Sequence, residues 1–187
     1  MADAIARYVK QTMLQDKYLS QADICKTASI EIKAPIDNVY PVIEELDFSR
    51  STIIYWLFKL RGIPVPESLT LKGLEKINFV KLETIHNQEI IIGLIGQFWK
   101  PTGKLRKFKP EEFISYSHVD FSKATWNFEL RKINDSKTQL ITETRVFCPT
   151  QKTKNRFHTY WTIIEPFSSW IRREILKAIK KQAESTP

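Results

Sequence analysis

The pattern of hydrophobic and polar positions predicts a chain built mainly of β-strands and closed by one long helix. Between Lys26 and Lys33 apolar residues alternate with polar ones, which is the period-2 pattern of a strand with one buried face. The same reading predicts five further strands, and His86-Asn87-Gln88 joins the first two of these as a hairpin. These strands are expected at residues 78–85, 89–99, 113–119, 124–133 and 138–148.

Two glycines, Gly93 and Gly96, lie inside one predicted strand. A glycine in a strand interior usually marks a bulge or a sharp bend. We therefore expect the sheet to curl at this point.

Helical spacing is found in three stretches. The first opens at Pro35, because proline is tolerated in a first helical turn, and Pro41 should bend it. The second covers Ser49–Leu60 and ends before a glycine and a proline. The third runs from Thr150 almost to Ser185, and Pro166 in its middle should kink it.

The order of these elements indicates an α+β fold. One strand, two short helices, a run of antiparallel strands and a long helix follow one another, and such helices gather on one face of the sheet. The chain of 187 residues suits one domain with an extension. We expect residues 1–24 to form an N-terminal extension and residues 25–185 the domain.

Composition and charge narrow the class of protein. The longest apolar run, Ile90–Ile95, is far shorter than the roughly 20 residues that span a bilayer. The first 18 residues have no signal-peptide pattern, so we expect a cytoplasmic protein. The formal net charge of +8 raises nucleic acid or an anionic membrane as a partner.

The residues that most often bind metals or perform redox chemistry are scattered. Cys25 and Cys148 form no CxxC motif, so two reduced thiols are expected, and the three histidines lack ligand spacing. No nucleotide, dinucleotide or hydrolase motif is present. We therefore expect neither a metal nor a cofactor. The histidines are His86, His118 and His158.

Ordered segments of the chain resemble a known superfamily. The stretch Ile30–Leu46 is similar to the opening strand, Ala-Pro turn and helix of the SRPBCC superfamily, which includes START lipid-transfer domains, birch-pollen-allergen-like proteins and polyketide cyclases. A narrower resemblance is to an uncharacterised bacterial branch of that superfamily. It rests on residues 57–64, 93–101, 142–146 and 157–176.

This resemblance implies a helix-grip fold with an internal cavity. A curved antiparallel sheet of six or seven strands would surround a long, kinked C-terminal helix, with two short helices after the first strand. The implied topology pairs the first strand with the last and brings Cys25 near Cys148, where a packed thiol pair is favoured over a redox switch.

The last predicted strand carries a charged pair, Glu143 and Arg145, on one face. If this face points inward, Arg145 offers a bidentate anchor for a carboxylate or phosphate, and Glu143 becomes a sequestered base. A structural pair or a solvated strand face is the alternative. We treat both residues as weak catalytic candidates and as ligand-binding candidates.

Aromatic residues supply further candidates for a ligand site, because large rings bury much area and carry a polar tip. Core packing is favoured for Trp126, and a cavity wall for Trp99 and Trp161. Hydroxyl groups of tyrosines could orient a polar end of the ligand. The full set of predicted ligand-binding residues is Trp99, Tyr116, Trp126, Glu143, Arg145, Tyr160, Trp161 and Ile164.

Two basic clusters account for much of the positive charge and could rest on an anionic membrane. Nucleic acid is not favoured, because no recognised binding motif accompanies the charge. The clusters are Lys100, Lys104, Arg106, Lys107 and Lys109 in one segment, and Arg172, Arg173 and Lys177 on the last helix.

Three functions follow from these observations. The leading one is binding or carriage of a hydrophobic small molecule such as a lipid, an isoprenoid or a polyketide-like compound. This function is favoured over an enzymatic one. The second is a cyclase-like or dehydratase-like enzyme that uses Glu143 or a tyrosine with Arg145. The third is a basic adaptor for a membrane surface or nucleic acid.

Overall fold

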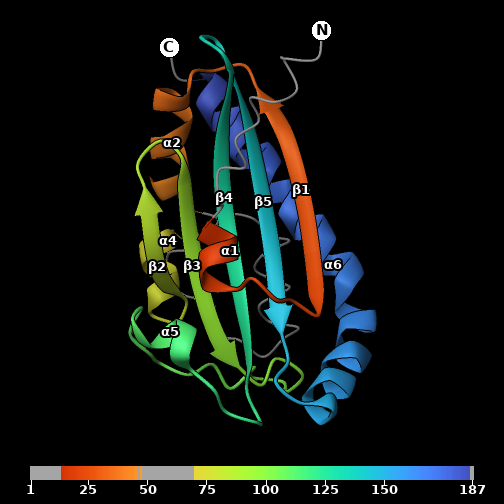
Figure 1. Ribbon diagram of the computed structural model, residues 1–187. Helices are drawn as coiled ribbons and strands as arrows, with labels where there is room; N and C mark the ends of the chain where they lie inside the picture. Colours follow the sequence, from red (N-terminus) through yellow and green to blue (C-terminus); the bar gives the residue numbers. More distant parts are fainter. Residues whose placement is uncertain (1–13, 46, 48–69, 186–187) are drawn as a thin grey trace, which may run out of the picture.

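The computed structural model describes residues 14–45, 47 and 70–185. Within them the chain forms one antiparallel sheet of five strands, ordered β1-β5-β4-β3-β2, with the long helix α6 behind it and the short helix α1 in front (Figure 1). The elements are α1 (Leu14–Tyr18), β1 (Ile24–Ile32), α2 (Ile36–Glu45), α4 (Leu71–Glu75), β2 (Val80–Ile85), β3 (Glu89–Gly96), α5 (Glu112–Ser115), β4 (Ser122–Asn134), β5 (Lys137–Phe147) and α6 (Gln151–Ser185).

The face of the sheet that packs against α6 and α2, here the inner face, carries the main core. Phe128, Leu140 and Ile32 on the sheet are fully buried there, as are Phe157 and Ile179 on α6. Burying such side chains stabilises the fold by roughly 1.5 to 3 kcal/mol each. The inner face of the sheet therefore packs against the first turns and the C-terminal half of α6.

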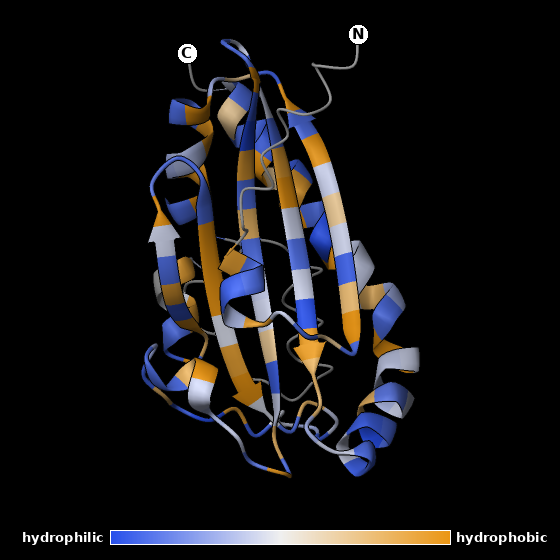
Figure 2. Ribbon diagram, in the orientation of Figure 1, coloured by the Kyte–Doolittle hydropathy of each residue, from blue (hydrophilic) through white to orange (hydrophobic). Residues whose placement is uncertain are grey.

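The opposite face, here the outer face, is also covered, so β3 is buried on both sides. All eight residues of β3 are buried, and Figure 2 shows this strand as hydrophobic along most of its length. Two short helices, α1 and α5, contribute Leu14 and Phe113 to a second cluster on this face. The cluster is completed by Leu82, Ile91, Ile95 and Phe108.

The fold class predicted from the sequence, an α+β helix-grip arrangement, is confirmed. The strand number is lower than expected, with five strands among the described residues and not six or seven, because residues 113–119 begin in helix α5 and do not pair with the sheet. Helix α2 is present with Pro41 inside it. The second predicted short helix, Ser49–Leu60, lies outside the described residues.

The long helix continues through Pro166, which removes one backbone hydrogen bond from its interior. Figure 1 shows α6 bent in its N-terminal part and not straight, as expected for a proline inside a helix. Within the described part of the chain, no helix is long and apolar enough to cross a membrane.

The glycines of β3 allow neighbouring atoms to pack close to the strand, and they do not themselves form a bulge. A Cβ atom on Gly93 would lie 2.9 Å from the side chain of Leu82. The bulge lies on the partner strand, where the register shifts between Lys81 and Glu83. The side chain of the extra residue, Leu82, thus occupies the space above Gly93.

The two cysteines lie on different faces of the sheet. Strands β1 and β5 do pair antiparallel, but Cys25 is opposite Arg145 and exposed, whereas Cys148 is buried in the inner core. The thiol of Cys148 is 3.3 Å from the hydroxyl oxygen of Ser122. The expectation of a packed thiol pair is therefore wrong.

Candidate functional site

A pocket of about 260 Å³ lies between α6, the end of β3 and the loop that follows β3. Its size is just below the roughly 300 to 1,000 Å³ that is typical of small-molecule sites. Most of its lining is apolar. The lining residues are Phe79, Leu94, Phe98, Trp99, Lys100, Pro101, Gly103, Leu105, Tyr160 and Ile164.

One wall of the pocket is the loop after β3, which folds back on the strand that it leaves. The amide nitrogens of Gln97 and Arg106 donate to the carbonyl oxygens of Gly103 and Ile95, each at 2.8 Å. A Cβ atom on Gly96 would lie 2.8 Å from the Gly103 carbonyl oxygen, so glycine is needed there for the loop to pack so closely. Gly103 itself has a φ of 65°, a conformation that glycine adopts without strain.

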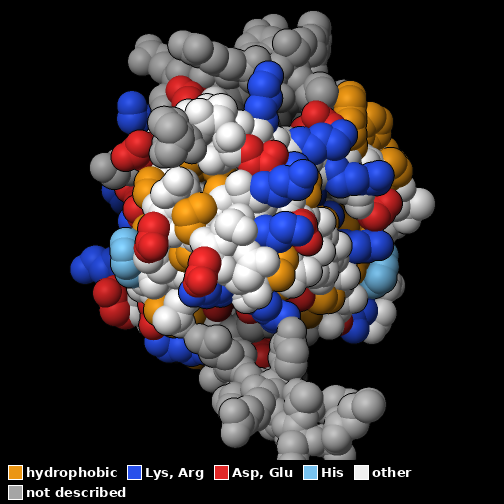
Figure 3. Space-filling view, turned by 90° about the horizontal axis from the view of Figure 1, so that it is seen from above, with side chains coloured by type: hydrophobic (Ala, Val, Ile, Leu, Met, Phe, Trp, Pro, Cys, Tyr) orange, Lys and Arg blue, Asp and Glu red, His pale blue; other side chains and the backbone are white. Residues whose placement is uncertain are grey.

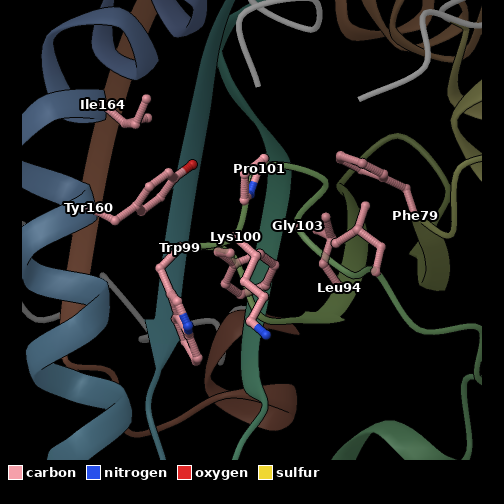
Figure 4. A pocket seen from close by; sticks show the side chains of 10 residues that line it. Phe79, Leu94, Trp99, Lys100, Pro101, Gly103, Tyr160 and Ile164 are labelled. Atoms are coloured by element: carbon pink, nitrogen blue, oxygen red, sulfur yellow. The ribbon is translucent and has the colours of Figure 1, made fainter. Parts of the chain in front are cut away.

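The facing wall is the N-terminal half of α6. Figure 4 shows Tyr160 extending from this helix with its hydroxyl group toward Pro101, while Phe79 and Leu94 lie across the pocket. Tyr160 also packs against Phe157, with the ring centroids 5.8 Å apart. Both walls are thus anchored to the core, so the pocket is held open by packed elements.

Three of the predicted ligand-binding residues, Trp99, Tyr160 and Ile164, line this pocket. The other two tryptophans lie in the inner core beside it. Trp161 stacks on Phe157 at 5.6 Å, and the indole nitrogen of Trp126 donates to the Thr142 hydroxyl oxygen at 2.8 Å. The pocket lining does not include these two residues.

The prediction that Glu143 and Arg145 point into the cavity is wrong, because both lie on the outer face beneath α1. Arg145 donates from Nη1 to the Asp16 carboxylate at 2.7 Å and pairs through Nε with Glu143. Glu143 also accepts from the Thr27 hydroxyl at 3.0 Å, and its carbonyl oxygen accepts from the Gln15 side chain at 2.9 Å. This cluster fastens α1 to the sheet.

Another buried carboxylate belongs to the same outer face. Glu89 accepts from the Leu14 backbone nitrogen at 2.8 Å and from the Asn127 amide at 2.6 Å. Burial raises the pKa of Glu89, against the opposing effect of these hydrogen bonds. Charge on this face therefore serves the attachment of α1 and is separated from the pocket by the sheet.

Tyr116 was predicted to orient a ligand, but it packs on the outer-face cluster beside Phe121. Its hydroxyl oxygen is buried and has no hydrogen-bond partner within the described residues. The Arg106 guanidinium lies 5.3 Å above the ring. Tyr116 is thus on the wrong side of the sheet to contact a ligand in the pocket.

The basic residues divide by exposure. Lys104, Arg106, Lys107 and Lys109 are exposed, while Lys100 is half-buried in the pocket wall. On α6, Arg173 and Lys177 are exposed but Arg172 is only 6% exposed, so the expectation that Arg172 faces a membrane is wrong. Figure 3 shows Lys and Arg side chains gathered at the end of the molecule where α6 ends.

Much of the apolar lining was not singled out as a ligand site from the sequence. Phe79, Leu94 and Leu105 are ordinary core-type residues, and only the path of the loop brings them together. Gly96 and Gly103, with Pro101 between them, were the available signal that the chain reverses sharply here.

The chemistry available in the pocket is limited. Among the described residues that line it, only Lys100 and Tyr160 have side chains that exchange protons, and none is a carboxylate or a histidine. The described residues also contain no group of three or more His, Cys, Asp or Glu placed to hold a metal ion. The arrangement suits the enclosure of an apolar molecule with one or two polar contacts.

Comparisons with known proteins give weak structural likenesses only. No protein-family model and no curated protein matches the chain. The aromatase/cyclase Zhui from Streptomyces sp. R1128 has 11% identity and a TM-score of 0.35 over 86% of this chain and 93% of that one. Norcoclaurine synthase from Thalictrum flavum has 13% identity and a TM-score of 0.36 over 87% of each chain.

A conserved protein from Geobacillus kaustophilus has 14% identity and a TM-score of 0.31, covering 86% of this chain and 93% of its own. Likenesses at this level do not assign a ligand or a reaction to the present chain.

Proposed function

We propose that this protein binds a small hydrophobic molecule, such as a lipid, an isoprenoid or a polyketide-like compound, in the pocket between α6 and the loop after β3. The observation that carries the proposal is an apolar pocket whose walls are both anchored to the core. Removal of apolar surface from water would drive binding, at roughly 25 cal/mol per Å². The volume of about 260 Å³ favours a compact ligand, or the apolar part of a longer one.

Binding is favoured over catalysis for two reasons. The charged pair that was the candidate catalytic group, Glu143 with Arg145, lies on the outer face. The described pocket lining offers no carboxylate or histidine, the residues that most often act as general acids and bases.

The proposal is tested with N-phenylnaphthylamine, a neutral apolar dye whose fluorescence rises when it leaves water. We expect saturable binding to the protein, and at least tenfold weaker binding to an Ile164→Trp variant, because the larger side chain fills the pocket. The matched control is Ile163→Trp on the same helix, since Ile163 is 66% exposed.

Unchanged dye binding in Ile164→Trp would place the ligand elsewhere. Absence of binding to the unmodified protein would remove the proposal. If the dye binds as expected, mass spectrometry of the protein purified under non-denaturing conditions from its own host identifies the natural ligand.

A second candidate function, association with an anionic membrane, is favoured by a surface stripe on α6. Ile163, Phe167 and Trp170 lie on one face of the helix at helical spacing and are 66%, 39% and 46% exposed. Arg173 and Lys177 continue this side of the helix, and each cation near an anionic surface contributes about 1 kcal/mol.

Sedimentation with vesicles tests this second candidate. We expect binding to vesicles that contain phosphatidylserine but not to pure phosphatidylcholine, and loss of binding when Phe167 and Trp170 are both changed to serine. Equal binding to both vesicle types would contradict it.

A further inference from the structure

The pocket between α6 and the loop after β3 has an apolar floor and a positively charged rim. Leu94 and Phe98 line the pocket and are buried, so they belong to its floor. Lys100 and Pro101 also line it, but Lys100 is half-buried and Pro101 is exposed, so they belong to the rim that meets the solvent. A ligand that enters the pocket therefore passes the Lys100 side chain before it reaches the floor.

The backbone of Lys100 is held in place by the turn that closes the pocket loop. Its amide nitrogen donates to the Gln97 carbonyl oxygen at 2.8 Å, and its carbonyl oxygen accepts from the Gly103 amide nitrogen at 2.8 Å. The side chain thus starts from a fixed point on the pocket wall. Its methylene groups can cover apolar surface while the charged amino group stays at the rim.

No acidic group neutralises the Lys100 amino group within the described part of the chain. The described pocket lining contains no carboxylate, and neither an ion pair nor a hydrogen bond joins this amino group to another described residue. In contrast, Lys154 on α6 pairs with the Asp23 carboxylate at 2.5 Å. The positive charge of Lys100 is therefore available to a ligand at the rim of the pocket.

We propose that the pocket binds an amphipathic ligand whose anionic head group, a carboxylate or a phosphate, pairs with Lys100 while its apolar part lies on the floor. A lysine ammonium binds either anion as a point charge on a flexible stem. Figure 4 shows the Lys100 amino group directed away from the Tyr160 hydroxyl, so the head group is assigned to Lys100 alone. This assignment rests on the proposed binding function and specifies the ligand as an anion with an apolar tail.

The experiment compares two dyes that share one skeleton. Anilinonaphthalene sulfonate carries an anionic group, which stands in for the carboxylate or phosphate, and N-phenylnaphthylamine carries none. We expect Lys100→Met to weaken binding of the anionic dye about tenfold, which corresponds to about 1.4 kcal/mol. The affinity for the neutral dye should stay within about twofold, because methionine keeps an unbranched apolar stem of similar length.

The matched control is Lys107→Met, which removes an exposed cation from the same loop and changes the net charge equally. It should leave the affinity for both dyes nearly unchanged at about 0.15 M salt, because a surface charge that does not touch the dye is screened. Lys100→Arg keeps the charge and should retain most of the affinity for the anionic dye. Should Lys100→Met fail to fold, Lys100→Gln serves the same comparison.

Displacement of the neutral dye distinguishes the two head groups. Octanoate and octyl phosphate are compared with octanol, and the anion that displaces the dye at the lower concentration names the head group.

The assignment to Lys100 would be overturned by any of three results. These are displacement by octanol as effective as by both anions, unchanged binding of the anionic dye in Lys100→Met, and an equal loss in Lys107→Met. Failure of the neutral dye to bind to the unmodified protein would overturn the proposed function instead, so the two failures are distinguishable.

Discussion

Replacing Arg145 with leucine tests whether the charged pair of β5 stabilises the fold or contacts a ligand. The substitution removes the hydrogen bonds from Arg145 to the Asp16 carboxylate at 2.7 Å and to the Leu19 carbonyl oxygen at 3.1 Å. It also leaves Glu143, 8% exposed, without its cation. The attachment of α1 to the outer face depends on these contacts.

The expected loss follows from the burial of the pair. Removing one partner of a fully buried ion pair costs about 3 to 5 kcal/mol. The side chains of Arg145 and Glu143 are 14% and 11% exposed, so some water reaches them and we expect a loss of about 2 to 4 kcal/mol. For a chain of this length that corresponds to a fall in Tm of about 5 to 15 °C.

Urea unfolding followed by tryptophan fluorescence measures this loss, and titration with N-phenylnaphthylamine at low temperature measures the pocket. We expect lower stability with dye affinity unchanged. The matched control is Lys137→Leu, which breaks the exposed pair with Glu31 at 2.8 Å and should change stability little. A stable Arg145→Leu variant that no longer binds the dye would refute the placement of this pair on the outer face.

Three further predictions follow from particular contacts. Burial raises the pKa of Glu89 above its ordinary value of 4.5, so the folded protein is stabilised by the protonated carboxyl at low pH and loses this stability as the pH rises. In urea unfolding, Glu89→Gln should therefore become more stable than the unmodified protein from about pH 4.5 upward. A thiol reagent should modify Cys25 in the folded protein but Cys148 only in denaturant, because Cys25 is exposed and Cys148 is 5% exposed. Burial raises the pKa of both thiols, so labelling should be faster at alkaline pH. Gly96→Ala should lower both stability, measured by urea unfolding, and dye affinity more than Gly93→Ala does. The new Cβ at position 96 meets a backbone carbonyl oxygen of the pocket loop at 2.8 Å, whereas the new Cβ at position 93 meets a movable leucine side chain at 2.9 Å.

The sequence was sufficient to predict the order of the strands and the long helix, because both follow from periodicity over many residues. The predicted strands at residues 124–133 and 138–148 match β4 and β5 within two residues at all four ends. The segment 113–119 was the exception. It has strand-forming residues, but Phe113 inserts from helix α5 into the outer-face cluster and no strand edge is paired with it.

The side of the sheet on which each residue lies was harder to predict. An alternating strand defines two faces but does not say which one meets the core when both are covered. On β5, Glu143 and Arg145 share a face, and the sequence left open whether this face points inward or outward. The direction of this face depends on α1, because α1 covers the outer face of the sheet. The five residues of α1 give too short a pattern to predict such a second covering layer.

The division of charge between the two faces is what connects the fold to the proposed function. On the outer face Arg145 has the carboxylates of Asp16 and Glu143 as partners, so this cluster contributes to folding. On the inner face Lys26 pairs with Glu165, whose carboxylate also accepts from the Ser169 hydroxyl. Among the described residues that line the pocket there is no carboxylate or histidine, so the proposed binding on the inner face depends on apolar contact and not on these charged pairs.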